Sequence, residues 1–519
     1  MVLAWTIADF RYRFRIRIAP IPLRGITFFV VGGVGTLTLA TDLWIAEQWP
    51  VPRGNLISTA VWQAVLGGCF FVTFLMWAWF AFIKPPRFGP ANAERFGYAV
   101  YFAVLKGDPS ELAVVADEFT SSAANVVHYA APKHRNSETR IRRVDAYAQD
   151  LLLLISDPRF CRAVIAKSPG TALAVFREME TQSKYDVPVG TFGQNLISEA
   201  MTNRDSFLFH ETEGYRTGLM GYLKPLSQTI FGNYRIVESA GTLLDPWHDS
   251  KWDAAQWAAF SRIALLALKG YISHGQGQHS SVLYRAFGYI ENSPHDLYKL
   301  NGLEGSSWED DARQRLAVAV DFLKEAVAEL DQAPRQYAPK RVRDRHSSRR
   351  TIHDRIADAI FEIIVKASSV KSPRTLAWMV QHNDVWGEFF NFSSLSGPAG
   401  KIIKFKVRRR IYDAILELEK FGNYQSAYLL GLCLNVMGLS LREHGHDLDT
   451  RALHRVVLKW TQEHFLELHA RDPWVAEACL LDGLTLDETN RRLARESGLG
   501  RRPSPSIAFL DLIPPQTLE

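Results

Sequence analysis

Two long apolar runs near the start of the chain restrict its folds more than any other feature. The first, from Gly25 to Ala46, contains one ionisable residue, Asp42, and the second, from Ala60 to Ile83, contains none. As a helix, each run is long enough to cross the roughly 30 Å hydrocarbon core of a bilayer. The sequence therefore predicts a transmembrane hairpin over residues 25–83. A cleavable signal peptide is the competing interpretation of the first run, but the run is too long and begins too late for one.

Basic residues on the two sides of the hairpin predict its orientation. Five arginines precede the first run, whereas the loop between the runs contains only Arg53. Lys84, Arg87 and Arg95 follow the second run. By the positive-inside rule both termini face the cytoplasm. We therefore expect a two-pass protein of the plasma (inner) membrane.

Small residues recur every four positions in both apolar runs. They are Gly32, Thr36 and Ala40 in the first run and Ala60, Ala64 and Gly68 in the second. Such stripes let helices approach closely in lipid, so we expect them to pack the hairpin; the alternative is that small residues only fill apolar runs. Asp42 is a candidate for an ion pathway, because intramembrane acids often serve that role. Its position near the outer boundary, where water can reach it, fits an interfacial residue better.

The segment before the hairpin, residues 1–24, contains the strict alternation FRYRFRIRI at positions 10–18. A period of two predicts an extended strand, with Arg11, Arg13, Arg15 and Arg17 on one side and apolar side chains on the other. We expect a basic interfacial strap whose arginines contact anionic lipid headgroups. The alternatives are an edge strand, with residues 506–513 as its partner, and a simple topology signal.

The remaining residues, 84–519, have the apolar spacing of helices. The fold class we predict is mainly α, with the hairpin followed by a large all-α region of irregular helical pairs or a solenoid-like stack. Asp108 before Pro109, Thr351 with Asp354, and the sequence TLDE at 485–488 read as helix starts, the last opening a helix over 485–496. We expect helical domains over 84–332 and 351–498, a basic linker over 333–350 and a loosely ordered tail over 499–519.

Positive charge is concentrated in a few segments of a chain whose net charge is only +5. One such segment, 401–410, contains Lys401, Lys404, Arg408 and Arg409, which are further candidates for lipid-headgroup contact. The alternative is pairing within the acidic remainder of the protein. The segment contains no recognisable nucleic-acid-binding module, so nucleic acid is not favoured as a partner.

Residues that could carry chemistry are few. His444, His446 and Asp449 are weak candidates for metal ligands, since their spacing matches no known site and a solvated loop explains them better. The four cysteines form no CxxC pair and read as reduced core residues. SGPAGKI at 396–402 departs from the P-loop pattern and is better read as a helix start. We therefore expect no cofactor and no recognisable catalytic site.

These features favour a membrane-anchored helical protein that acts as an interaction, sensing or scaffold module at the inner face of the membrane. Its partners would be anionic lipid headgroups, an unidentified protein and further copies of itself. One alternative is an oligomeric channel or membrane-permeabilising effector gated by the cytoplasmic region. The other is a membrane-associated enzyme whose site has no sequence motif.

Overall fold

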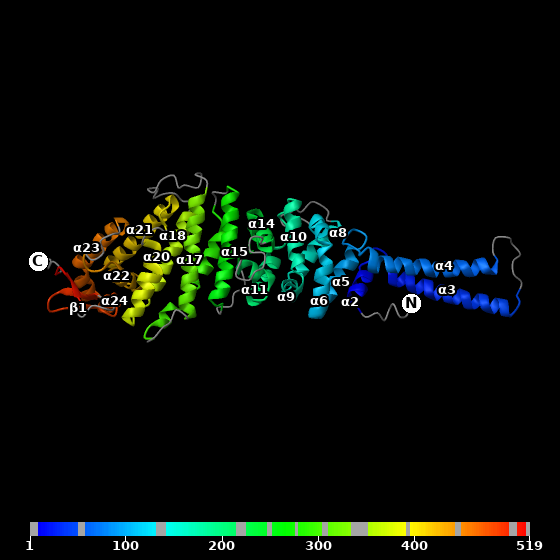
Figure 1. Cartoon of the computed structure of the whole chain (residues 1–519), viewed down its shortest axis with the longest axis horizontal. Coiled ribbons are helices and arrows are strands. Elements are labelled where there is room, and N and C mark those ends of the chain that lie inside the picture. Colours follow the sequence, from blue (N-terminus) through cyan, green and yellow to red (C-terminus); the bar gives the residue numbers. More distant parts are fainter. Residues whose placement is uncertain are drawn as a thin grey trace. The chain divides into compact units, whose positions relative to one another are not determined.

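The structure is a computed structural model. It describes residues 9–49, 58–130, 142–213, 225–245, 252–275, 279–303, 310–333, 351–390, 395–441, 448–497 and 506–514. Across these residues the fold is mainly helical, as predicted (Figure 1). The chain forms two compact units, Met1–Trp247 and His248–Glu519.

The first unit opens with a short helix, α2 (Phe10–Arg17), so the predicted extended strand is wrong. The Asp9 carboxylate caps the helix by accepting a hydrogen bond from the Arg11 amide at 2.9 Å. Phe14 and Ile18, four residues apart, are buried on one helix face. The alternation of apolar and basic residues therefore also satisfies a helix, in which every fourth residue returns to the same face.

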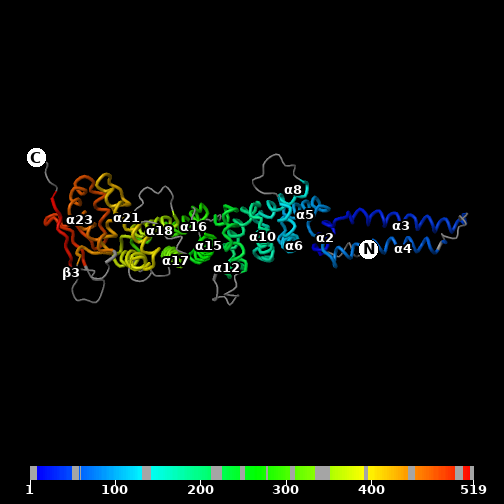
Figure 2. Tube along the Cα trace, turned by 90° about the horizontal axis from the view of Figure 1, so that it is seen from above, coloured from blue at the N-terminus to red at the C-terminus, as the bar shows by residue number. Residues whose placement is uncertain are grey.

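The hairpin consists of α3 (Leu23–Ala46), α4 (Thr59–Ala78) and a π-helical extension, η1 (Trp79–Ile83). By length and composition, two helical stretches in the described chain could cross a membrane. They are Leu23–Ala46 and Ala60–Ile83. The helices lie side by side (Figures 1 and 2). At their contact the Trp62 indole Nε1 donates to the Thr41 hydroxyl at 3.0 Å.

Ten helices of the described chain complete the first unit. They are α5 (Ala93–Lys106), α6 (Pro109–Thr120), α7 (Ala123–Tyr129), α8 (Arg143–Leu154), α9 (Pro158–Lys167), α10 (Pro169–Thr181), α11 (Gly190–Thr202), α12 (Phe207–Glu213), α13 (Pro225–Phe231) and α14 (Tyr234–Ala240). The helix α9 packs against α6 and α11, and α10 packs against α7 and α13. The Phe96 ring contacts those of Phe88, Phe119 and Phe14. Through Phe14, α2 belongs to the core of this unit.

The second unit is also built from packed helices. Its helical elements are α15 (Ala254–Ser273), α16 (Ser281–Asn292), η3 (Leu297–Leu300), α17 (Asp311–Gln332), α18 (Ile352–Ser368), α19 (Arg374–Trp378), η5 (Met379–Trp386), α20 (Gly387–Phe390), α21 (Pro398–Lys420), α22 (Tyr424–Met437), α23 (Leu448–Arg471) and α24 (Pro473–Ala478). The helix α17 packs against α15, α18 and α21. The basic segment 334–350 lies outside the described residues, and the helices that flank it belong to the same unit. The predicted domain boundary therefore falls within the second unit.

The predicted helix starts have different outcomes. Asp108 caps α6, and Thr351 and Asp354 form the capping box of α18, as expected. A helix also begins at Pro398, within the segment 396–402.

The helix expected over 485–496 is wrong, because this segment forms β1 (Leu484–Asp487) and β2 (Arg492–Ser497). In the turn between the strands, the Asp487 side chain accepts hydrogen bonds from the Asn490 amide and side chain. This local bonding competes with helix capping.

The expectation of a loosely ordered tail is wrong for residues 506–511. They form β3 (Ser506–Asp511), which pairs antiparallel with β2 so that Asp511 lies opposite Arg492. The remaining described strand, β1, pairs with the other edge of β2. The alternative that residues 506–513 pair with residues 10–18 is also wrong, because β3 pairs with β2 and residues 10–17 are helical.

Candidate functional site

The helix α2 separates the four arginines that a strand would have kept on one side. Arg11 and Arg15 face α6, where the Arg11 Nη2 lies 2.8 Å from the Asp117 carboxylate. The Arg15 guanidinium donates to both Glu118 oxygens, from Nε at 2.8 Å and from Nη2 at 2.6 Å. Two of the residues predicted to contact lipid headgroups are therefore engaged within the protein.

Arg15 also joins α2 to the end of the hairpin. Its Nη1 donates to the carbonyl of Ala81, in η1, at 2.9 Å. A π-helical segment leaves carbonyls out of the usual i to i+4 pattern and often marks a functional position. The Arg15 side chain thus connects α2, η1 and α6 at the end of the hairpin where η1 lies.

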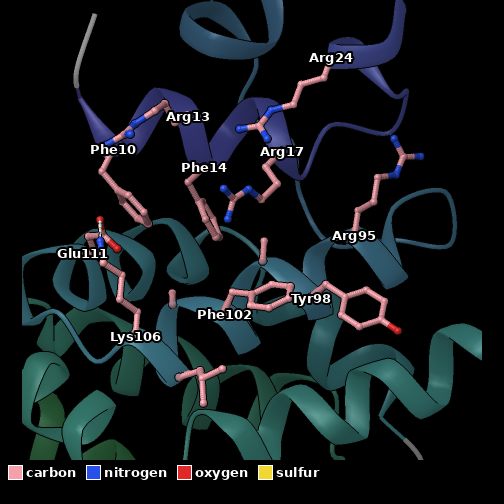
Figure 3. A pocket seen from close by; sticks show the side chains of 13 residues that line it. Phe10, Arg13, Phe14, Arg17, Arg24, Arg95, Tyr98, Phe102, Lys106 and Glu111 are labelled. Carbon is pink, nitrogen blue, oxygen red and sulfur yellow. Dashed lines mark hydrogen bonds and ion pairs between the residues drawn. The ribbon is translucent and has the colours of Figure 1, made fainter. Parts of the chain in front are cut away.

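The other two arginines of α2 line a groove between α2 and α5, which we call the α2–α5 groove. Its volume is about 770 Å³, and Arg13, Arg17, Arg24 and Arg95 contribute to its wall. In Figure 3 the Phe10 and Phe14 rings point from α2 toward α5. The groove lies where α2, the first turn of α3 and α5 meet.

Positive charge dominates the α2–α5 groove. Among the described residues that line it, Glu111 is the only acid, and the Lys106 Nζ holds its carboxylate at 2.6 Å. Partial desolvation, followed by repulsion from Arg24 and Arg13, lowers the pKa of the Arg17 guanidinium. A bound anion would relieve this repulsion.

The α5 side of the groove continues into an exposed apolar stripe. Tyr98 and Phe102 are each 53% exposed and Leu105 is 61% exposed, with Tyr101 beside them at 45%. The spacing of three and four residues places these side chains on one helix face. Large apolar patches on a folded surface commonly mark interaction sites for proteins, ligands or membranes.

The hairpin presents its small residues outward. All six predicted packing residues, Gly32, Thr36, Ala40, Ala60, Ala64 and Gly68, are exposed. A Cβ atom added at Gly32 or Gly68 would meet nothing within 4 Å. The Trp62 indole joins α4 to Thr41 of α3, and the buried residues of α4 include Leu66 and Trp77. Asp42, the ion-pathway candidate, is exposed near the C-terminal end of α3.

The basic residues of α21 are partly neutralised within the second unit. Lys406 pairs with Asp354 and Arg410 pairs with Asp358, both of α18, while Arg409 lies 3.6 Å from Asp413. Of the other residues predicted to contact lipid, Lys401 is exposed, Lys404 is buried and Arg408 is half-buried. The alternative of pairing with acidic residues thus accounts for several of these charges.

The described residues give no support to the predicted metal ligands or to a cysteine nucleophile. His444 and His446 lie outside the described residues, Asp449 falls in the first turn of α23, and the described part contains no cluster that could hold a metal ion. Cys161, Cys433 and Cys479 are buried, as expected for core residues, whereas Cys69 is exposed on α4. Burial raises the pKa of the Cys479 thiol to about 12, so it is a poor nucleophile.

Sequence reasoning missed the α2–α5 groove as a unit. In the sequence, Arg24 and Arg95 indicate only the orientation of the hairpin, and their presence in one groove with Arg17 depends on the fold. The spacing of Tyr98, Phe102 and Leu105 does indicate a surface of this kind, because three large apolar residues share a helix face.

Comparisons with known protein families, with curated proteins and with solved structures give no match for the chain.

Proposed function

We propose that the chain is a two-pass membrane protein whose hairpin anchors the helical units at the cytoplasmic face of the plasma membrane. There the helical units act as an interaction, sensing or scaffold module for a protein partner. The observation that carries the proposal is the exposure of the hairpin's apolar side chains. Phe28, Phe29 and Leu39 are 76%, 77% and 72% exposed.

Burial distinguishes this hairpin from the core of a soluble protein. Only 6% of the apolar window of α3 and 22% of that of the second stretch are buried inside the protein. Apolar surface in water costs roughly 25 cal/mol per Å². A bilayer removes this cost without requiring contact with the rest of the chain. The cationic α2–α5 groove at one end of the hairpin supports the inward orientation of that end.

Fractionation and protease protection of the full chain, with a tag at its C-terminus, test the proposal. We expect the protein to sediment with membranes, to resist alkaline extraction, and to lose its tag to protease in inverted vesicles but not in intact cells. Recovery in the supernatant without detergent, or loss of the tag from intact cells, would contradict it.

A matched pair of variants tests whether the hairpin is the anchor. Phe28→Asp with Phe29→Asp places two charges near the N-terminal end of the first apolar run, where each costs less than the roughly 2.5–3.5 kcal/mol of a charge at a helix centre. We expect this variant to shift toward the soluble fraction. Phe421→Asp changes a residue of similar exposure, 72%, in the second unit and is expected to remain in the membrane fraction.

An oligomeric channel is the second candidate, favoured by the outward-facing small residues of the hairpin. Two helices do not enclose a pore, so conduction would require several hairpins packed through these exposed faces. Conductance of liposomes containing the purified protein, reduced by Gly68→Ile, would support this candidate. The open space beside Gly68 means that the substitution does not disturb the packing of α3 against α4.

A further inference from the structure

We infer that the α2–α5 groove is a binding site for one anionic phospholipid, with the phosphate held by the arginines and an acyl chain lying along the apolar stripe of α5. This inference rests on the proposed membrane anchoring and specifies a ligand for the inner end of the hairpin.

The charge of the groove fits a phosphate group. Four guanidinium groups from three helices, on Arg13, Arg17, Arg24 and Arg95, line one space of about 770 Å³ (Figure 3). Guanidinium groups bind phosphate through paired, charge-assisted hydrogen bonds. Lys106 pairs with Glu111, the only acid among the described residues of the lining, so the described lining has a net positive charge that suits an anion.

Arg95 provides an independent reason to expect an acceptor in this region. Its Nη2 donates to the carbonyl of Pro20 at 2.7 Å, which fixes the guanidinium beside the start of α3. Its Nη1 is buried and has no hydrogen-bond partner in the described chain. Buried donors are almost always satisfied in folded proteins, so a ligand that carries acceptor oxygens suits this position.

The apolar side of the groove favours a lipid over a soluble phosphate compound. Tyr98 and Phe102 line the groove together with Leu105, and each of these side chains is more than half exposed. A small soluble anion would leave this surface in water, whereas an acyl chain would cover it. The groove also adjoins the first turn of α3, where a spanning helix meets the headgroup layer.

Native mass spectrometry of the full chain in neutral detergent tests the inference. The protein is titrated with phosphatidylglycerol, with phosphatidylcholine of the same acyl chains, and with glycerol 3-phosphate. We expect preferential binding of one phosphatidylglycerol and weak competition by glycerol 3-phosphate. Equal binding of the two lipids would overturn the inference, and equally strong binding of glycerol 3-phosphate would assign the groove to soluble phosphates.

Variants locate the lipid. Arg13→Gln with Arg17→Gln should weaken phosphatidylglycerol binding roughly thirtyfold, from about 1 kcal/mol for each cation removed. Phe102→Ser should weaken binding of the lipid but not of glycerol 3-phosphate. The control, Arg142→Gln, removes an exposed arginine of the same unit that lies outside the groove and should have no effect. Unchanged lipid affinity in the double variant would overturn the inference.

Two further measurements distinguish loss of the lipid site from unfolding of the variant and from failure of membrane anchoring. Thermal unfolding of each variant reports whether it is folded, and if the double variant unfolds, Arg17→Gln alone is expected to lose roughly fivefold in affinity. Sedimentation of the untreated protein reports anchoring. Protein that sediments with membranes but binds both lipids equally rejects only the lipid site, whereas protein that is soluble without detergent rejects the anchoring.

Discussion

Arg15 and Glu118 form a bidentate ion pair that fixes α2, the helix before the hairpin, to the helical core of the first unit. The Glu118 carboxylate is almost fully buried, and the third donor of Arg15 binds the Ala81 carbonyl at the end of the hairpin. One side chain therefore contacts three elements, α2, α6 and η1. A displacement of η1 relative to the helical core would have to break this pair or move α6 with it.

Replacement of Arg15 by Ala should destabilise the first unit. The substitution leaves the Glu118 carboxylate buried without its main partner, which costs about 3 kcal/mol, near the lower limit for buried pairs because Arg15 is partly exposed. Hydrogen exchange of the full chain in detergent should show faster exchange in α2 and α6. In the control Lys459→Ala, which removes an exposed pair with Glu463 in the second unit, the loss should be about 1 kcal/mol or less, with no change in α2 and α6. Similar exchange in both variants would contradict the prediction.

The hairpin and the helical class were predictable because their signals are local. Apolar length and the capping residues Asp108 and Thr351 are read directly from neighbouring positions. The conformation of α2 was not decided by its pattern, since the apolar residues at 10, 14 and 18 fit both a strand and a helix. The burial of Phe14 against Phe96, more than eighty residues away, selects the helix. Tertiary contacts therefore determine the helical conformation of α2, for which the sequence periodicity is ambiguous.

The candidate site was only partly predictable for the same reason. The sequence predicted lipid contact for all four arginines of α2, but Arg11 and Arg15 pair with α6 instead. Which arginines face a groove depends on the helical phase of α2 and on the acids of a distant helix. Similarly, TLDE fits a helix cap, but the Asp487 turn and pairing with β2 produce a sheet.

The second unit contains a buried pair whose disruption should be more damaging. Arg313 and Asp384 are 1% and 4% exposed, with Nε and Oδ2 separated by 2.6 Å. Asp384→Asn removes the negative charge and leaves the guanidinium buried, so we expect a loss of about 3–5 kcal/mol in the free energy of unfolding. Denaturant unfolding of the full chain measures it. Arg409→Gln, which alters an exposed pair, should change stability by about 0.5 kcal/mol or less. A loss of that small size for Asp384→Asn would show that the buried pair is dispensable.

Stability should fall on mild acidification because of His353. Burial is the main cause that lowers the pKa of His353 in the folded protein, below the value of about 6.5 expected in the unfolded chain. Near pH 6 the unfolded chain therefore binds more protons than the folded protein. The stabilisation is present above pH 6.5 and is lost as the pH falls through the folded pKa.

Thermal unfolding of the full chain between pH 7.5 and pH 5 measures this effect. We expect the unfolding temperature to fall with pH, and to fall less steeply in His353→Phe. The control, His295→Gln, changes an exposed histidine and should retain the slope of the unsubstituted protein. Identical slopes in all three proteins would show that His353 does not control the pH dependence.

The cysteines allow the position of the hairpin to be tested without any substitution in it. Cys69 is exposed on α4 near the middle of the second apolar stretch, whereas Cys161, Cys433 and Cys479 are buried. In a bilayer, a membrane-impermeant charged maleimide cannot reach Cys69, so we expect the native protein in vesicles to remain unlabelled and to react at four thiols after denaturation. Mass spectrometry counts the adducts. Gly68→Cys should be equally protected, and Ser110→Cys, on the exposed surface of α6, should react in the native state. Rapid labelling of Cys69 in native vesicles, opened so that both faces meet the reagent, would place α4 in water and would contradict the proposed anchor.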